Sequence, residues 1–235
     1  MSWSRVYASA VLDPLAEQLA GLAGIRAGMR VVDVLAGSGR LTRRLLTSVG
    51  PSGQVTAIED GDSAAAELRD ELRAARVHAD VAAASPGALP FGDRHFDAAL
   101  SLVRITATRG GVAALEEMAR VAPHVAVLVP RRGAVEDALI AAWTAVSGDP
   151  PAHLLATFEP PPLPVDWTSQ VVSDVARFDG IGQLSQALIR QHELSLPVDA
   201  ARAVERLLGD ALARHAGADG TLRVPVQVTL LRSAA

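Results

Sequence analysis

Residues 31–39, with the sequence VVDVLAGSG, constrain the fold more than any other stretch of this chain. Residues 31–34 are rich in valine and show no polar alternation, which predicts a strand buried on both faces of a parallel sheet. Gly37 and Gly39 permit a tight turn in which the backbone approaches a ligand. Residues 40–49 then show helical spacing. A strand, a glycine turn and a helix start together predict a nucleotide-type site at the carboxyl end of the strand.

The composition excludes several classes of function. The formal net charge of −4 argues against a polyanionic partner, so nucleic acid is not an expected ligand. The chain has no cysteine, which excludes a disulfide framework, a thiolate metal site and a cysteine nucleophile. None of the six histidines has metal-ligand spacing with another, so the sequence predicts no metal site.

The sequence predicts a cytoplasmic protein without a membrane partner. The N-terminus lacks the apolar core of a signal peptide, and no apolar run is long enough to span a bilayer. A length of 235 residues, 49% of them hydrophobic, suits one α/β domain with a sizeable core. The sequence leaves the oligomeric state open, with a homodimer as one alternative.

Strand-like and helix-like segments alternate along the chain. Apolar segments predict strands at 31–34, 54–58, 77–84, 96–103, 124–130, 170–178 and 222–231. The intervening segments predict helices at 40–49, 63–76, 112–121, 131–146, 182–192 and 198–215, after an N-terminal helix at 6–23. Such alternation implies right-handed crossovers, so we expect an α/β fold with a Rossmann-like, doubly wound, mostly parallel seven-stranded sheet.

Prolines and one serine mark the ends and breaks of these elements. Pro14 lies inside the N-terminal helix and can break it in two. The run EPPPLP at 159–164 is predicted to form a stiff surface loop rather than a linker, because too little chain follows it to build a second core. Regular pairing in the last strand is expected to begin after Pro225. Ser63 is a candidate N-cap for the helix at 63–76.

Two residues outside the glycine turn are candidate ligand contacts. Glu59 ends the second strand, about twenty positions after the turn, where a carboxylate accepts hydrogen bonds from ribose hydroxyls. The alternative for Glu59 is a solvated loop carboxylate. Tyr7, the single tyrosine of the chain, either packs the N-terminal helix onto the domain or covers a bound ligand.

At this point the sequence resembles a known family. The glycine turn, Glu59, the run LPFGDRHFD at 89–97 and the segment EMARV at 117–121 follow each other in the order of class I S-adenosylmethionine-dependent methyltransferases. Among these it looks most like the small-molecule group of bacterial secondary metabolism that includes ubiquinone/menaquinone C-methyltransferase-like enzymes. The resemblance covers essentially the whole chain. It implies a single domain at 1–235, with an N-terminal helical segment at 1–30 and a helical cap at 180–220 over the substrate cavity.

The resemblance also implies a cofactor site for S-adenosylmethionine, with S-adenosylhomocysteine as the product. Glu59 matches the ribose-binding acid of the family. Ser85 and Pro86 occupy the loop that contacts adenine in relatives, and Ser101 and Leu102 match the floor beneath the sulfonium. The full set of implied cofactor contacts is Tyr7, Asp33, Leu35, Ala36, Gly37, Ser38, Gly39, Glu59, Asp60, Ser85, Pro86, Ser101 and Leu102.

Three positions depart from the family pattern. Leu35 stands where relatives have a small residue, so its side chain either crowds the methionine part of the cofactor or turns into the core. Asp60 stands where relatives have an apolar residue against adenine. Residues 104–106, Arg-Ile-Thr, follow the fourth strand where many relatives carry a histidine that acts as a base.

The leading hypothesis is methyl transfer from S-adenosylmethionine to an oxygen or carbon of a small molecule. Positioning supplies much of the acceleration, and a base is needed only for a poorly acidic acceptor. His153 and His192 are candidate bases, and Arg104 is a candidate for binding an anionic substrate oxygen, with an ordinary surface arginine as the alternative. A cyclase or isomerase on the same fold that no longer transfers methyl is the second hypothesis, and a non-catalytic binding module is the third.

Overall fold

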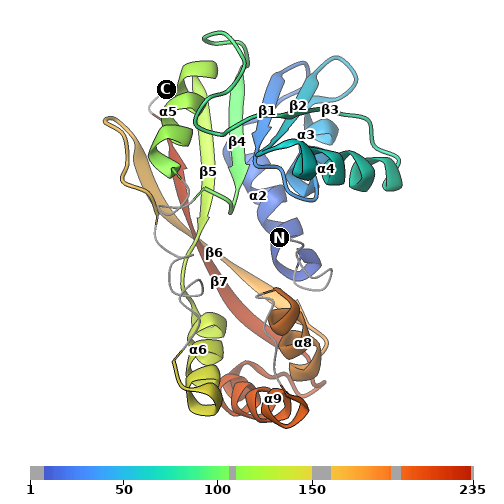
Figure 1. Cartoon of the computed structure of the whole chain (residues 1–235), viewed down its shortest axis with the longest axis vertical. Coiled ribbons are helices and arrows are strands. Elements are labelled where there is room, and N and C mark those ends of the chain that lie inside the picture. The colour runs from blue at the N-terminus through green and yellow to red at the C-terminus, as the bar shows by residue number, and fades with distance from the viewer. Residues whose placement is uncertain (1–7, 106–109, 150–159, 192–196, 234–235) are drawn as a thin grey trace. The chain divides into compact units, whose positions relative to one another are not determined.

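The computed structural model describes residues 8–105, 110–149, 160–191 and 197–233 (Figure 1). The chain divides into two compact units. One unit comprises Leu15–Pro130, Glu159–Val171 and Thr229–Ala235. The other comprises Met1–Pro14, Arg131–Phe158 and Val172–Val228. The glycine turn and its neighbouring strands belong to the first of these, which is called the glycine-turn unit below.

Alternating strands and helices build the glycine-turn unit. After α2 (Asp13–Leu22), its strands are β1 (Arg30–Val34), β2 (Gln54–Glu59), β3 (Asp80–Ala83), β4 (Ala98–Leu102) and β5 (His124–Pro130). Its helices are α3 (Arg40–Val49), α4 (Asp62–Ala74) and α5 (Gly111–Val121). The helix α3 packs on β1 and β2, α4 on β2 and β3, and α5 on β4 and β5. Every predicted strand and helix between residues 31 and 130 is therefore present.

The sheet has seven strands in the order β3-β2-β1-β4-β5-β7-β6. The first five strands pair in parallel, with Val32 opposite Thr56 on β2 and Ala99 on β4. This confirms the predicted Rossmann-like α/β fold. Because β1 lies between β2 and β4, the carboxyl ends of these three strands meet at one edge of the sheet. That edge carries the glycine turn and Glu59.

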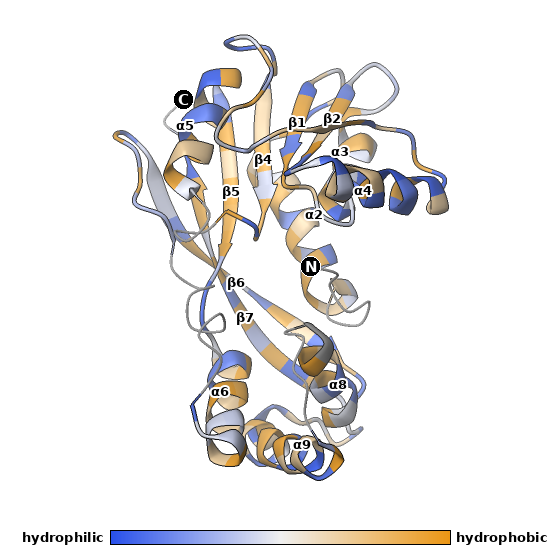
Figure 2. Cartoon of the chain, in the orientation of Figure 1, coloured by the Kyte–Doolittle hydropathy of each residue, from blue (hydrophilic) through white to orange (hydrophobic). Residues whose placement is uncertain are grey.

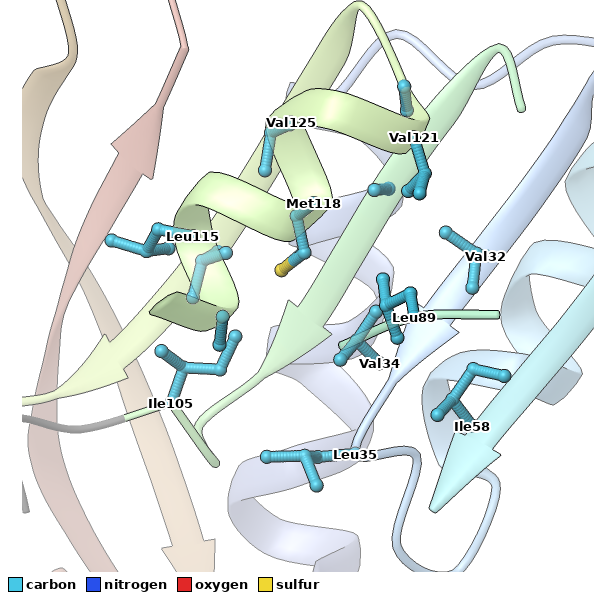
Figure 3. Packing of buried hydrophobic residues seen from close by; sticks show 14 of the residues in the cluster. Val32, Val34, Leu35, Ile58, Leu89, Ile105, Leu115, Met118, Val121 and Val125 are labelled. Carbon is cyan, nitrogen blue, oxygen red and sulfur yellow. The ribbon is translucent and has the colours of Figure 1, made fainter. Parts of the chain in front are cut away.

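A dense apolar core lies between the sheet and α5. Leu115 and Met118 of α5 pack with Val32 and Val34 of β1 and with Ile58 of β2 (Figure 3). Hydropathy follows this arrangement, since β5 is largely apolar along its length, whereas α4 is mostly hydrophilic (Figure 2). Side chains alternate along a strand, so Asp33, between Val32 and Val34, points to the opposite face of the sheet, toward α3.

The second unit combines helices with parts of the last two strands. It contains the π-helical turn η1 (Ala8–Leu12), α6 (Ala134–Ser147), α8 (Ile181–Gln191), α9 (Val198–Leu212) and the short 3-10 helix η3 (Ala213–His215). The strands β6 (Thr168–Phe178) and β7 (Leu222–Arg232) run through both units. Here α9 packs against both α6 and α8. The single-domain organisation and the cap over a substrate cavity remain predictions.

Several boundaries differ from the sequence-based expectations. Ser63 does not cap α4, which begins one residue earlier after Gly61 without a side-chain cap. The chain changes from π-helix to α-helix at Asp13, so Pro14 lies in the first turn of α2, where its missing N–H is tolerated. Strand β7 begins before Pro225, although the hydrogen bond from Arg131 N to Gln227 O lies after that proline. Among the described residues, no helix has the length and apolar character needed to cross a bilayer.

Candidate functional site

The glycine turn closes the end of β1 against the end of β2. Ala36 N donates to Ile58 O at 3.1 Å, and Gly39 N donates to Ala36 O at 3.0 Å. Gly37 and Gly39 have φ values of 62° and 72°, a backbone conformation that favours glycine. The turn is therefore tied to both strands, and Gly39 leads directly into α3.

Gly39 is also needed for space. A Cβ on Gly39 would lie 2.7 Å from Leu72 Cδ2 and 3.1 Å from Leu68 Cδ1, so α4 leaves no room for a side chain. A Cβ on Gly37 would lie 3.4 Å from Nη1 of Arg104. Gly39 thus permits close helix packing, whereas at Gly37 the same construction shows that the guanidinium of Arg104 lies in ordinary contact range of the turn.

Glu59 connects β2 to the turn. Its side chain is only 3% exposed, and its Oε1 accepts a hydrogen bond from Gly37 N. Its Oε2 lies 3.6 Å from Nη2 of Arg104. The structure therefore excludes the alternative of a solvated loop carboxylate, because Glu59 is buried and bonded to the turn backbone. A carboxylate held in this way presents its second oxygen at the strand ends.

Asp33 is a fully buried carboxyl group beneath the turn. Its Oδ2 accepts a hydrogen bond of 2.6 Å from Thr42 Oγ1, while Oδ1 is buried without a hydrogen-bond partner. Burial raises the pKa of Asp33, the Thr42 hydrogen bond opposes the rise, and the nearby charge of Glu59 adds to it, with a net pKa of about 7. Asp33 consequently ties α3 to β1 and takes up a proton near neutral pH.

Leu35 turns into the core. It is 4% exposed and belongs to the same apolar cluster as Ile58, Leu89 and Ile105 (Figure 3). Its φ of 58° lies in the left-handed region, which a leucine rarely adopts. Of the two alternatives for this position, the structure supports core packing. The hydrophobic contacts compensate for a backbone conformation that suits the small residue of the family pattern.

Arg104 reaches the turn because the chain bends sharply after β4. Val103 has φ of 52°, an outlier for a β-branched residue, and its N–H bonds to Leu128 O at 2.8 Å. The side chain of Arg104 is only 17% exposed. Glu59 is an ion-pair partner of Arg104, and the charge of Arg104 also acts on Asp33, whose pKa it lowers. A largely buried guanidinium therefore lies beside both carboxyls of the turn.

The other candidate residues are placed around this centre. Ser101 is fully buried and donates to Val34 O at 2.6 Å, so its hydroxyl joins β4 to β1. Ala84 N bonds to Glu59 O at 2.9 Å, which brings the loop of Ser85 and Pro86 close to the end of β2. Asp60 and Ser85 are exposed, Leu102 and Pro86 are buried, and Ala36 and Ser38 are half-buried. Tyr7, His153 and His192 lie outside the described residues.

Two features near the site were not assigned a role from the sequence. Thr42, the hydrogen-bond partner of Asp33, belongs to no motif noted in the sequence. Its position in the first turn of α3 is only a weak indication of this role. The pair Glu117–Arg120 serves a structural purpose, since Arg120 bonds to Leu89 O at 3.0 Å and to Phe91 O at 2.8 Å, and Glu117 accepts from Leu89 N. Arg120 thereby holds the loop before β4. Its spacing of three residues from Glu117 predicts an ion pair, but not what the pair holds.

No cluster of three or more potential metal ligands occurs among the residues that the structure describes. The charged groups at the turn include the carboxyls of Asp33 and Glu59 and the guanidinium of Arg104, and Nη1 of Arg43 donates to Ser38 O at 3.2 Å. Such groups suit an organic ligand with hydroxyl and charged groups. The arrangement fits an adenosyl cofactor. The glycine backbone admits close approach, and Glu59 supplies an acceptor at the ends of adjacent parallel strands.

Comparison with known proteins agrees with this geometry. Residues 31–123 match a family model described as a methyltransferase domain. The ubiquinone/menaquinone biosynthesis C-methyltransferase UbiE of Ectopseudomonas mendocina is 41% identical over 78 residues, covering 32% of this chain and 30% of the relative. The same enzyme of Shewanella pealeana is 42% identical over 77 residues, 32% of this chain and 31% of the relative. The chain thus spans less than a third of the length of these relatives.

Similar folds occur among solved structures. The YcgJ protein of Bacillus subtilis has a TM-score of 0.58 and 12% identity, covering 94% of this chain and 99% of that protein. The [4+2]-cyclase SpnF has a TM-score of 0.53 and 18% identity, covering 95% and 81%. Residues 31–123 therefore resemble a methyltransferase domain, and the likeness to these solved structures shows a shared Rossmann-like fold. A match to this family model makes S-adenosylmethionine the expected cofactor.

Proposed function

We propose that the protein transfers a methyl group from S-adenosylmethionine to an oxygen or carbon of a small molecule, within bacterial secondary metabolism. The observation that carries this proposal is the hydrogen bond from Gly37 N to Glu59, which joins the glycine turn to the acid at the ends of β1 and β2. The match of residues 31–123 to a methyltransferase domain supports the same reaction class. The expected products of this reaction are S-adenosylhomocysteine and the methylated small molecule.

Each side chain has a distinct part in this proposal. Glu59 accepts hydrogen bonds from the ribose hydroxyls, and the backbone of Gly37 and Gly39 lies against the cofactor. Ser85 and Pro86, next to the end of β2, border the adenine. The remaining contacts expected from the family pattern are Tyr7, Asp33, Leu35, Ala36, Ser38, Asp60, Ser101 and Leu102. Of these, Asp33, Leu35 and Ser101 are buried and act by holding the strands and the turn in place.

The chemistry requires positioning more than covalent help. The sulfonium supplies an activated methyl group, so a nucleophile held in line with the sulfur–methyl bond needs little else. A guanidinium donates hydrogen bonds and accepts none, so Arg104 suits an anionic oxygen and does not serve as a base. Asp33 is fully buried and bonded to Thr42, which makes it a structural group rather than a base. His153 and His192 remain the candidate bases for an acceptor that must lose a proton.

Calorimetry with S-adenosylmethionine and S-adenosylhomocysteine tests the cofactor assignment. The variant Glu59→Gln keeps an amide oxygen for Gly37 N–H but loses the carboxylate charge. We expect it to bind either ligand about tenfold to a hundredfold more weakly than the wild type. Glu71→Gln, on the exposed side of α4, is the matched control and should bind as the wild type does. Equal binding by Glu59→Gln and the wild type would contradict the assignment.

Incubation with methyl-labelled S-adenosylmethionine and a panel of hydroxylated and enolisable small molecules tests the reaction. Labelled product whose mass has increased by one methyl group is the expected result. Cofactor binding without transfer to any acceptor would count against catalysis and favour a binding module. A cytoplasmic location and a homodimer remain predictions from the sequence.

A second candidate function is a cyclase or isomerase that no longer transfers methyl. The observation in its favour is the guanidinium of Arg104, which lies beside Gly37 where the cofactor is proposed to bind. Such an enzyme would act by holding a flexible substrate in a reactive shape. Conversion of a substrate without change of mass, in protein stripped of cofactor, distinguishes it from a methyltransferase.

A further inference from the structure

The contact between Arg104 and the glycine turn lies where the cofactor is proposed to bind. Nη1 of Arg104 lies 3.4 Å from the position of a Cβ on Gly37, and its Cδ lies 3.7 Å away. The guanidinium therefore rests on the segment of backbone that the proposed cofactor must approach. Glu59, the proposed ribose acceptor, is at the same time the ion-pair partner of Arg104.

The contact between Arg104 and Glu59 is an ion pair without a short hydrogen bond. The distance of 3.6 Å from Nη2 to Glu59 Oε2 is that of an ion pair rather than a hydrogen bond. The two side chains are only 17% and 3% exposed, so water screens their attraction less than at an open surface. The ion pair is consequently strong enough to compete with a ligand for the carboxylate of Glu59. It nevertheless lacks the bidentate geometry of a permanent structural ion pair.

We propose that Arg104 is an electrostatic gate of the cofactor site, which occupies the turn and neutralises Glu59 until the cofactor displaces it. This inference rests on the proposed function. The strained φ of Val103 supports it, because that residue directs the chain after β4 toward the turn. The gate also lowers the affinity of the site for the methyl donor relative to the product. The sulfonium of S-adenosylmethionine is cationic and is repelled by the guanidinium, whereas the thioether of S-adenosylhomocysteine is neutral.

Calorimetry on charge-altering variants tests the gate. Arg104→Met keeps much of the bulk of the side chain and removes its charge, and Arg104→Ala removes both. We expect each to bind S-adenosylmethionine about fivefold more tightly than the wild type, which is the upper end of what a partly screened ion pair contributes. S-adenosylhomocysteine should gain less, about threefold, because it lacks the sulfonium charge.

Two control variants separate charge from other effects. Arg104→Lys keeps the charge and should bind S-adenosylmethionine nearly as the wild type does. Arg73→Ala also loses an arginine paired with a carboxylate, Asp70 at 2.6 Å, but on the exposed side of α4, and should change nothing. Raising the ionic strength from about 50 mM to about 500 mM should change the difference between wild type and Arg104→Met only slightly, because the pair is largely buried. Thermal melting of each variant shows that the fold is retained.

Specific outcomes overturn the gate. Weaker binding by Arg104→Met would mean that Arg104 holds the cofactor, and equal binding would mean that the contact with Glu59 does not compete with it. An equal gain by Arg104→Lys would show that charge is not the cause. In these cases binding by the wild type still supports the proposed function. If neither ligand binds the wild type or any variant, the proposed cofactor and the gate fail together.

Discussion

Leu35 offers a sharp test of how the turn is held, because its backbone and side chain have opposite preferences. The side chain is buried at 4% exposure, whereas the backbone has φ of 58°, where only glycine is free of strain. We compare Leu35→Ala, which loses the burial and keeps the strain, with Leu35→Gly, which loses both. At ordinary positions alanine is more stabilising than glycine. At Leu35 we expect the reverse.

The magnitude follows from three contributions. Truncation of a buried leucine costs about 2–5 kcal/mol of unfolding free energy, and both variants lose this. Relief of the left-handed conformation returns about 1–2 kcal/mol to the glycine variant alone. The greater chain entropy of glycine in the unfolded state lowers the free energy of unfolding of Leu35→Gly by about 0.5–1 kcal/mol. The net expectation is that Leu35→Gly is more stable than Leu35→Ala by roughly 0.5–1 kcal/mol, although both are less stable than the wild type.

Urea denaturation at equilibrium measures these differences. Val34, the neighbouring residue, is also buried but has no positive φ, so Val34→Ala should be more stable than Val34→Gly. If Leu35→Ala proves more stable than Leu35→Gly by the same margin as at Val34, the strain argument is wrong. Because the side chain lies in the core, S-adenosylmethionine should bind folded Leu35→Gly within about threefold of the wild type. Binding that appears only in Leu35→Gly would show that leucine blocks the site.

Three further perturbations test other parts of the unit. The pKa of Asp33 is about 7 in the folded state against 3.8 for the unconstrained group, so the native state binds its proton more tightly. The stability of the wild type should therefore fall between about pH 4 and pH 7, and Asp33→Asn should lose this slope in urea titrations across that range. Gly39→Ala should lower the free energy of unfolding, measured by chemical denaturation, by about 3 kcal/mol, because its Cβ would meet Leu72 and its φ is positive. A decrease of less than about 1 kcal/mol would contradict the packing argument. Arg120→Ala should lower the melting temperature by releasing the carbonyls of Leu89 and Phe91, while calorimetry shows unchanged cofactor affinity; an unchanged melting temperature would refute the clamp.

Local sequence patterns were sufficient for the architecture. Buried parallel strands leave continuous apolar runs such as 124–130, and surface helices leave a repeat of 3.6 residues, so strands and helices of the glycine-turn unit follow from periodicity. The predicted ends of the helices were less accurate where the capping residue decides at which residue a helix begins. Ser63 has the side chain of an N-cap, yet α4 begins after Gly61, because the turn from Glu59 sets where the helix starts.

The sequence by itself determined the order of elements, the glycine turn and the presence of an acid after the second strand. Only the tertiary structure decided that Leu35 turns into the core, that Asp33 is buried with a pKa near neutrality, and that Arg104 lies on Gly37 against Glu59. The physical reason is that hydrophobic periodicity is a property of neighbouring residues in the sequence. It shows which face of a helix or strand is apolar. The ionisation of a carboxyl group and the partner of a guanidinium depend on residues from other strands, which only folding brings together.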